Sequence, residues 1–145
     1  MLGKYGISPG SVELWGTGTP LREFLWSEDM ADACVHVMEQ VDFSQLKGED
    51  RNVRNCHINI GTGKEISIGD LARLIAATED YRGKLVFNAD KPDGTMRKLT
   101  DVSKLHSLGW QHRVELEEGV ERITVVSGPD GRSRQLTLPP APRSP

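Results

Sequence analysis

Residues 11–41 read SVELWGTGTPLREFLWSEDMADACVHVMEQV, and the pattern within this stretch decides the fold class. Apolar and polar side chains alternate over residues 12–15, which predicts a half-buried strand. The Gly- and Pro-rich residues 16–20 break that strand, and residues 22–26 predict a second one. The two strands are therefore expected to form an excursion around the Gly/Pro turn.

A helix is expected to follow. Ser27 is placed to cap it, and Glu28 and Asp29 lie in its first turn, where acidic side chains are favourable. A single apolar stripe then recurs at spacings of three and four residues. It comprises Met30, Ala33, Cys34, Val37, Met38 and Val41. The pattern predicts that Cys34 packs in the core and that His36, away from the stripe, faces solvent.

Strands and helices alternate further along the chain, which is typical of an α/β fold. The expected elements are a strand over 57–60, a helix opened by Ser67, a strand over 85–87, a short helix ended by Gly109 and a last helix over 116–123. The short strand over 57–60 has few long partners in this chain. It indicates a sheet that continues in other residues.

Composition indicates a single soluble domain in a reducing cytoplasm. The chain has 145 residues, of which 37% are hydrophobic and 27% charged, with two cysteines. A net charge of -3 and a pI near 5.8 argue against binding to nucleic acid. No apolar run is long enough to span a membrane, so no membrane partner is expected.

Composition also suggests three regions along the chain. Residues 1–10 contain Gly and Pro and are expected to form a poorly ordered head. Residues 11–126 form the folded body. Residues 127–145 hold five of the eight prolines and three arginines, so they are expected to be a disordered tail.

The usual catalytic and cofactor motifs are absent. The sequence has no G-x-G-x-x-G, no Walker A motif, no Y-x-x-x-K pair and no metal-ligating constellation. Gly-x-Gly occurs at 16–18 and at 61–63, where turns are the simpler interpretation. Cys56 and His57 are neighbours on a strand, so their side chains point to opposite faces and make a poor nucleophile pair. His106 and His112 have no partner acid at ligand spacing and are expected at the surface.

Five side chains remain candidates for binding. The Arg22 guanidinium follows a turn and suits a diphosphate, although a surface ion pair is the simpler alternative. Arg97 and Lys98 form a second cationic site of the same kind. Trp15 is either a core residue or the wall of a ligand site. Asp93 lies in a Pro-Asp-Gly sequence and is either a turn former or a functional acid.

Four strings carry a family resemblance: VELWGTGTPLREFL (12–25), HINIGTG (57–63), KPDGTMRKL (91–99) and SKLHSLGW (103–110). Together they resemble the C-terminal, substrate-binding part of the GDP-L-fucose synthases. These are extended short-chain dehydrogenases/reductases within the NAD-dependent epimerase/dehydratase family. The resemblance covers about residues 11–123, and after it the chain departs from the family pattern.

The resemblance implies what the parent enzyme does. It epimerises C3 and C5 of GDP-4-keto-6-deoxy-D-mannose and reduces C4 with NADPH, giving GDP-L-fucose. Trp15, Arg22 and Asp93 fall on substrate-contacting positions, and Lys98 is a further candidate. Catalytic and NADP(H)-binding residues belong to an N-terminal Rossmann part that is missing here, and the parent is expected to be a homodimer. The isolated chain is therefore expected to be inactive. The alternatives are a non-enzymatic GDP-sugar-binding module and a truncated product with no activity of its own.

Overall fold

The structure is a computed structural model that describes residues 7–47 and 55–126, without the side chains of 124–126. Most of the expected head and the whole expected tail therefore lie outside the described residues. Within the described head, Ile7 forms a bridge with Val12, and the Ser8 amide donates to the Ser11 carbonyl at 2.8 Å.

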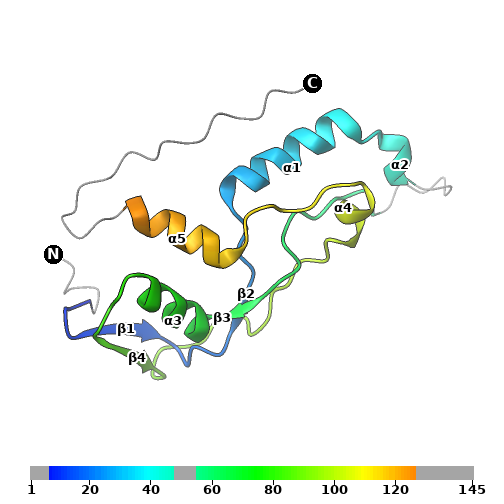
Figure 1. Ribbon diagram of the computed structural model, residues 1–145. Coiled ribbons are helices and arrows are strands. Elements are labelled where there is room, and N and C mark those ends of the chain that lie inside the picture. The colour runs from blue at the N-terminus through cyan, green and yellow to red at the C-terminus, as the bar shows by residue number, and fades with distance from the viewer. Residues whose placement is uncertain (1–6, 48–54, 127–145) are drawn as a thin grey trace.

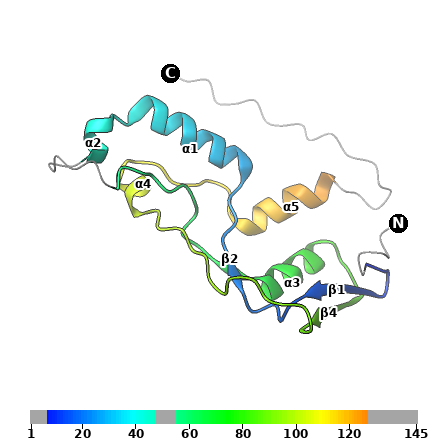
Figure 2. The same cartoon turned by 180° about the vertical axis from the view of Figure 1, so that it is seen from behind.

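The described residues form nine elements in the order ββααβαβαα. They are β1 (Ser11–Trp15), β2 (Leu21–Arg22), α1 (Ser27–Gln40), α2 (Phe43–Lys47), β3 (Ile66–Ser67), α3 (Ile68–Thr78), β4 (Lys84–Asn88), α4 (Ser103–Ser107) and α5 (Leu116–Val126). Figures 1 and 2 show two groups of elements. One contains β1, β4, α3 and α5, and the other contains α1, α2 and α4, with β2 and β3 between them.

Two small sheets organise these groups. β1 pairs in parallel with β4, from Ser11 opposite Lys84 to Trp15 opposite Asn88. β2 pairs antiparallel with β3. The expected excursion of two strands around residues 16–20 is therefore wrong, because β1 and β2 belong to different sheets. The second strand is also shorter than expected, since β3 has only two residues before α3 begins and offers no longer partner.

The helices follow local signals. The Ser67 hydroxyl accepts the Asp70 amide at 2.9 Å and caps α3, as expected for a serine at this position. Gly109 has a φ of 90° directly after the C-cap of α4, which confirms its expected place there. Ser27 does not cap α1; it is the first helical residue, and Trp26 holds the cap position without a side-chain bond.

The core joins α1 to the region around α4. Ala33 and Leu105 are fully buried, and Trp110 is 4% exposed beside them. Val37 packs against this cluster, but other members of the α1 stripe are not covered: Met38 is 84% exposed and Cys34 is exposed. The expectation that Cys34 packs in the core is wrong, because among the described residues only the Ala33 side of the stripe has a neighbour to pack on.

Residues 57–60 are not a strand in the structure. Their side chains nevertheless alternate in exposure, and Ile58 and Ile60 pack against the core cluster. No strand in the described part of the chain pairs with them. Side-chain exposure alternates as in a strand, but the described residues provide no strand that pairs with residues 57–60.

Candidate functional site

Two segments far apart in the sequence, residues 16–22 and 91–98, lie side by side. The Leu21 amide donates to the Met96 carbonyl at 2.8 Å. The Thr17 amide and hydroxyl donate to the two carboxylate oxygens of Asp93 at 2.9 and 2.7 Å. These contacts bring the segments that carry three of the four predicted site residues into one region of the fold, and the fourth, Trp15, directly precedes the first segment.

The turn that follows β1 needs glycine at two positions. Gly16 and Gly18 have φ values of 86° and 79°, a region that disfavours side chains. A methyl group would meet the Asp93 carboxylate at Gly16 and the Phe87 ring at Gly18. The first Gly-x-Gly string is therefore a tight turn packed against protein groups, as its spacing suggested.

The second Gly-x-Gly string also has its amides occupied. The Thr62 and Gly63 amides donate to one oxygen of Glu23 at 2.6 and 2.7 Å. In the first turn, the Thr17 amide donates to Asp93, the Gly16 amide to the Asn88 carbonyl and the Thr19 amide to the Thr17 hydroxyl. These bonded amides are not available to a phosphate of a dinucleotide.

Arg22 is half-buried, and its guanidinium donates to the neighbouring Leu21 carbonyl at 2.6 Å. Among residues 7–47 and 55–126, no carboxylate forms an ion pair with it. The guanidinium borders a hollow of about 210 Å³ that Thr62 and Lys64 also line. It lies close to Gly94, where a methyl group would come within 3.2 Å of Nη2. The surface ion pair that was the simpler alternative is not found.

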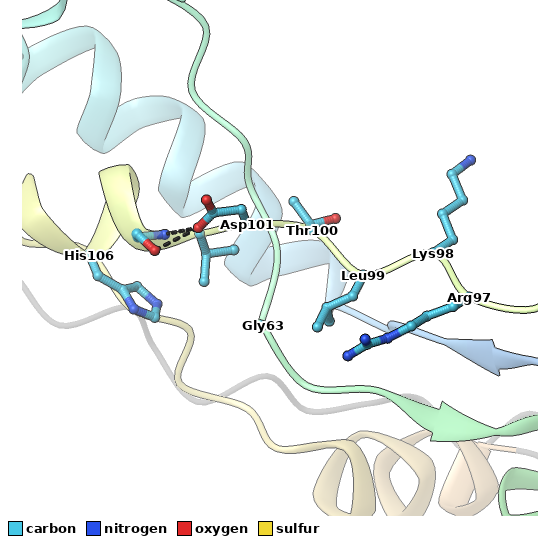
Figure 3. Close-up of a pocket in the computed structure, with 9 residues that line it drawn as sticks. Gly63, Arg97, Lys98, Leu99, Thr100, Asp101 and His106 are labelled. Atoms are coloured by element: carbon cyan, nitrogen blue, oxygen red, sulfur yellow. Dashed lines mark hydrogen bonds between the residues drawn. The ribbon is translucent and has the colours of Figure 1, made fainter.

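The two cations of residues 97 and 98 have different environments. Arg97 makes a forked ion pair with Glu65, with Nε at 2.9 and 3.0 Å from its two oxygens, and this pair raises the pKa of Arg97. Lys98 points to the opposite side of the chain (Figure 3). It is exposed and, within the described ranges, makes no ion pair. Of the two, Lys98 is available to a ligand.

Lys98 borders a hollow of about 650 Å³ (Figure 3). Thr100, Asp101 and His106 line its other parts. The Asp101 carboxylate accepts the Ser103 amide at 3.0 Å and the Ser103 hydroxyl at 2.6 Å, so it orders the entry into α4 and has a lowered pKa. The rim of this hollow is polar and carries a free ammonium.

Trp15 is not a core residue. Its side chain is 73% exposed at the end of β1, and the Lys91 ammonium lies 5.4 Å from the ring centroid. This geometry is that of a cation–π contact at the surface. Of the two alternatives for Trp15, core packing is excluded, and the ring presents an open face at the start of the 16–22 segment.

Glu23 is a central residue that the pattern alone did not single out. Its carboxylate accepts the Thr62, Gly63 and Thr100 amides. Burial alone would raise the pKa of Glu23, but the hydrogen bonds from Thr100, Gly63 and Thr62 outweigh it and lower the pKa. The available signal was its place directly after Arg22 on a strand next to a turn.

The histidines are less exposed than expected. His36 Nε2 lies 3.0 Å from the Leu108 carbonyl, so it links α1 to the end of α4 and does not face solvent. The His112 side chain is only 9% exposed, with Nε2 at 3.4 Å from Glu115. His106 is half-buried. The expectation of surface positions is wrong because the 106–112 segment folds back over α1, which its local sequence does not reveal.

Comparison with known proteins places the chain in a family. The model of the NAD dependent epimerase/dehydratase family matches residues 2–61. The GDP-L-fucose synthase of Escherichia coli (strain K12) is 50% identical over 109 residues, which are 75% of this chain and 33% of that protein. A GDP-6-OMe-4-keto-L-xylo-heptose reductase from C. jejuni superposes with a TM-score of 0.78 at 48% identity, covering 83% of this chain and 34% of that one. A GDP-D-glycero-L-gluco-heptose synthase from Campylobacter jejuni, solved in the presence of NADPH, superposes with a TM-score of 0.73 at 46% identity. This match covers 83% of this chain and 34% of that one.

The matched part of the chain belongs to the NAD-dependent epimerase/dehydratase family. Within that family, its curated relatives at 45–50% identity are GDP-L-fucose synthases, which confirms the resemblance carried by residues 12–25 and 91–99. The expected α/β part of an extended short-chain dehydrogenase/reductase is likewise confirmed. The chain spans about a third of the length of the curated relatives it matches. No helix within the described ranges is long and apolar enough to cross a bilayer.

Proposed function

We propose that this chain supplies recognition of a GDP-sugar to an enzyme of the GDP-L-fucose synthase type. One observation carries the proposal: Arg22 and Lys98 are two cations without a carboxylate partner among the described residues, on segments joined through Asp93 and Thr17. A planar guanidinium forks onto diphosphate oxygens, and an ammonium adds a point charge. Each relative reported above carries a GDP-linked sugar in its name.

The other two site residues take supporting roles in this proposal. The open Trp15 ring walls the site next to the 16–20 turn, where it can cover the apolar face of a bound nucleotide or sugar. Asp93 first connects the 91–98 segment to the turn after β1, since each of its oxygens already accepts a hydrogen bond from Thr17. Each carboxylate oxygen keeps a second lone pair, which can accept from a ribose hydroxyl or a base N–H.

The reaction is proposed for the whole enzyme. It is the NADPH-dependent 3,5-epimerisation and 4-reduction of GDP-4-keto-6-deoxy-D-mannose to GDP-L-fucose, in a cytoplasmic homodimer. The Thr17, Thr62 and Gly63 amides of the two Gly-x-Gly turns are bonded to Asp93 and Glu23, so these amides are not available to the phosphates of the cofactor. In this proposal NADP(H) is held by an N-terminal Rossmann part, and the chain alone is expected to be inactive.

Two features support a partner of that kind. On α1, Met30, Val35 and Met38 are 40%, 52% and 84% exposed. Residues 57–60 alternate in burial like a strand but lack a described pairing partner. A dinucleotide-binding half that contains a sheet with an unpaired edge strand could pair with residues 57–60 and cover the exposed apolar side chains of α1. Mixing the chain with the Rossmann half of a relative should restore NADPH oxidation with the keto-sugar. Persistent inactivity of a folded, associated mixture would contradict this partner.

Binding of GDP to the full chain tests the recognition itself. Isothermal titration or amide NMR should detect saturable binding, and Arg22→Ala or Lys98→Ala should each weaken it about tenfold, the value of one charge-assisted contact. Arg82→Ala is the matched control, because Arg82 is 85% exposed in a pair with Asp80. Equal affinity of the Arg22→Ala and Arg82→Ala variants would refute the proposed site.

A further inference from the structure

The Glu23 carboxylate joins three separate segments of the chain. One oxygen accepts the Thr62 amide at 2.6 Å, the Gly63 amide at 2.7 Å and the Thr62 hydroxyl at 3.3 Å. The other oxygen accepts the Thr100 amide at 3.0 Å. The end of β2, the 61–63 turn and the 97–100 segment therefore meet on a single side chain.

The surroundings of Glu23 are built for this contact. Gly61 is buried, and a methyl group there would lie 2.5 Å from the Glu23 oxygen. Backbone amides of a turn that converge in this way form a site for an anion, and an internal carboxylate fills it here. A neutral side chain would leave at least one of the three amides (Thr62, Gly63 and Thr100) without an acceptor. Leaving a partly buried amide without an acceptor is costly.

The bonded groups flank the two free cations. Glu23 directly follows Arg22, and Thr100 is two residues after Lys98. Two extended residues span about 7 Å, so each cation is tied at short range to the same carboxylate. Asp93 also joins these segments through Thr17, but that contact lies further from both cations along the chain.

We infer that Glu23 is a positioning residue: it holds together the segments that carry Arg22 and Lys98, so that both can bind a diphosphate, without touching that ligand itself. The inference rests on the proposed function. It adds that the strength of nucleotide binding depends on an acid with no ligand contact. A purely structural Glu23 would instead affect the free energy of unfolding and leave the contribution of Arg22 to binding unchanged.

A double-mutant cycle separates these two roles. The variants are Glu23→Gln, Arg22→Ala and their combination in the full chain, with GDP as the ligand and Glu39→Gln on exposed α1 as the control. Glu23→Gln should keep a dispersed amide spectrum, shift the Thr62, Gly63 and Thr100 resonances, and weaken GDP binding about tenfold. The double variant should lose clearly less than a further tenfold relative to Arg22→Ala alone, since the arginine to be positioned is then gone and only the positioning of Lys98 remains to be lost.

Three outcomes decide the matter. Binding by Glu23→Gln within twofold of the wild-type chain, or losses that multiply in the double variant, would overturn the inference and leave the proposed function standing. No GDP binding by the folded wild-type chain would reject both. If Glu23→Gln does not fold, Glu23→Asp keeps the charge with a shorter reach, and its cycle with Arg22→Ala is read by the same criteria.

Discussion

Replacing Asp29 by alanine should destabilise the fold by about 3 kcal/mol. The Asp29 side chain is 5% exposed at the start of α1, and its Oδ2 accepts the Arg113 amide at 2.9 Å and the Val114 amide at 2.8 Å. A hydrogen bond to a charged group contributes about 1.5 kcal/mol or more, and alanine leaves both donors without an acceptor. The loss also removes one tie between α1 and the segment before α5, which Asp32 still holds through Trp110 and Arg113.

An asparagine at the same position gives a sharper test. Both amides donate to the same oxygen of Asp29, so the single amide oxygen of asparagine can accept both bonds. Asp29→Asn should therefore lose only the contribution of the charge, about 1 kcal/mol. Asp29→Ala should therefore destabilise the fold more than Asp29→Asn. This order follows from the two bonds to one Asp29 oxygen, and the position of Asp29 in the helix does not predict it.

Urea denaturation followed by circular dichroism measures these differences, with Glu28→Ala as the matched control. Glu28 lies in the same first turn but is exposed, so its loss should cost about 0.5 kcal/mol through the helix dipole. In thermal scans Asp29→Ala should lower the Tm by more than about 10 °C. If Asp29→Ala costs no more than Glu28→Ala, Asp29 acts only as a helix N-terminal acid and the reasoning is refuted.

Two further predictions concern the turn after β1 and the response to pH. Gly18→Ala should lower the free energy of unfolding by about 2–4 kcal/mol in urea denaturation, because a methyl group there meets the Phe87 ring at a positive φ. Gly10→Ala is the control: a methyl group there meets nothing within 4 Å, so its effect should stay within about 0.5 kcal/mol. Equal costs for the two variants would refute the clash. The pKa of Glu23 is lower in the fold than in the unfolded chain, so its contribution is present above about pH 5 and is lost as the pH falls through its folded pKa. The stability difference between the wild-type chain and Glu23→Gln should shrink from pH 7 to pH 3, and a constant difference would contradict this.

The elements with local signals were predictable from the sequence. The apolar periodicity of residues 116–123 identified α5, and the serine at 67 identified the start of α3, since the cap, the first turn and the stripe all lie within a few residues. Alternation over residues 12–15 identified β1, and the apolar run over residues 85–87 identified β4. The strand over 57–60 failed because forming a strand requires a partner, and its alternation of burial survives without one.

The chemistry of the candidate site was partly readable as well. A guanidinium after a Gly/Pro turn suggested that Arg22 binds an anion, and the strings around it identified the family. The sequence did not show which cations are available to a ligand and which are paired within the protein. Arg97 and Lys98 are adjacent and equally charged, yet only Arg97 pairs with Glu65, because successive side chains of an extended segment point to opposite sides.

By itself the sequence determined α1, α3, α4 and α5, the two main strands, the turn glycines and the family, but not the short helix α2. Only the tertiary structure decided that β1 pairs with β4, that Asp93 fastens Thr17 and that Glu23 gathers three amides. The physical reason is the range of the interactions. Caps and apolar stripes act over a few residues, whereas these contacts join groups 39 to 77 residues apart. Their energy is gained only after the intervening chain has closed, and no local pattern records that closure.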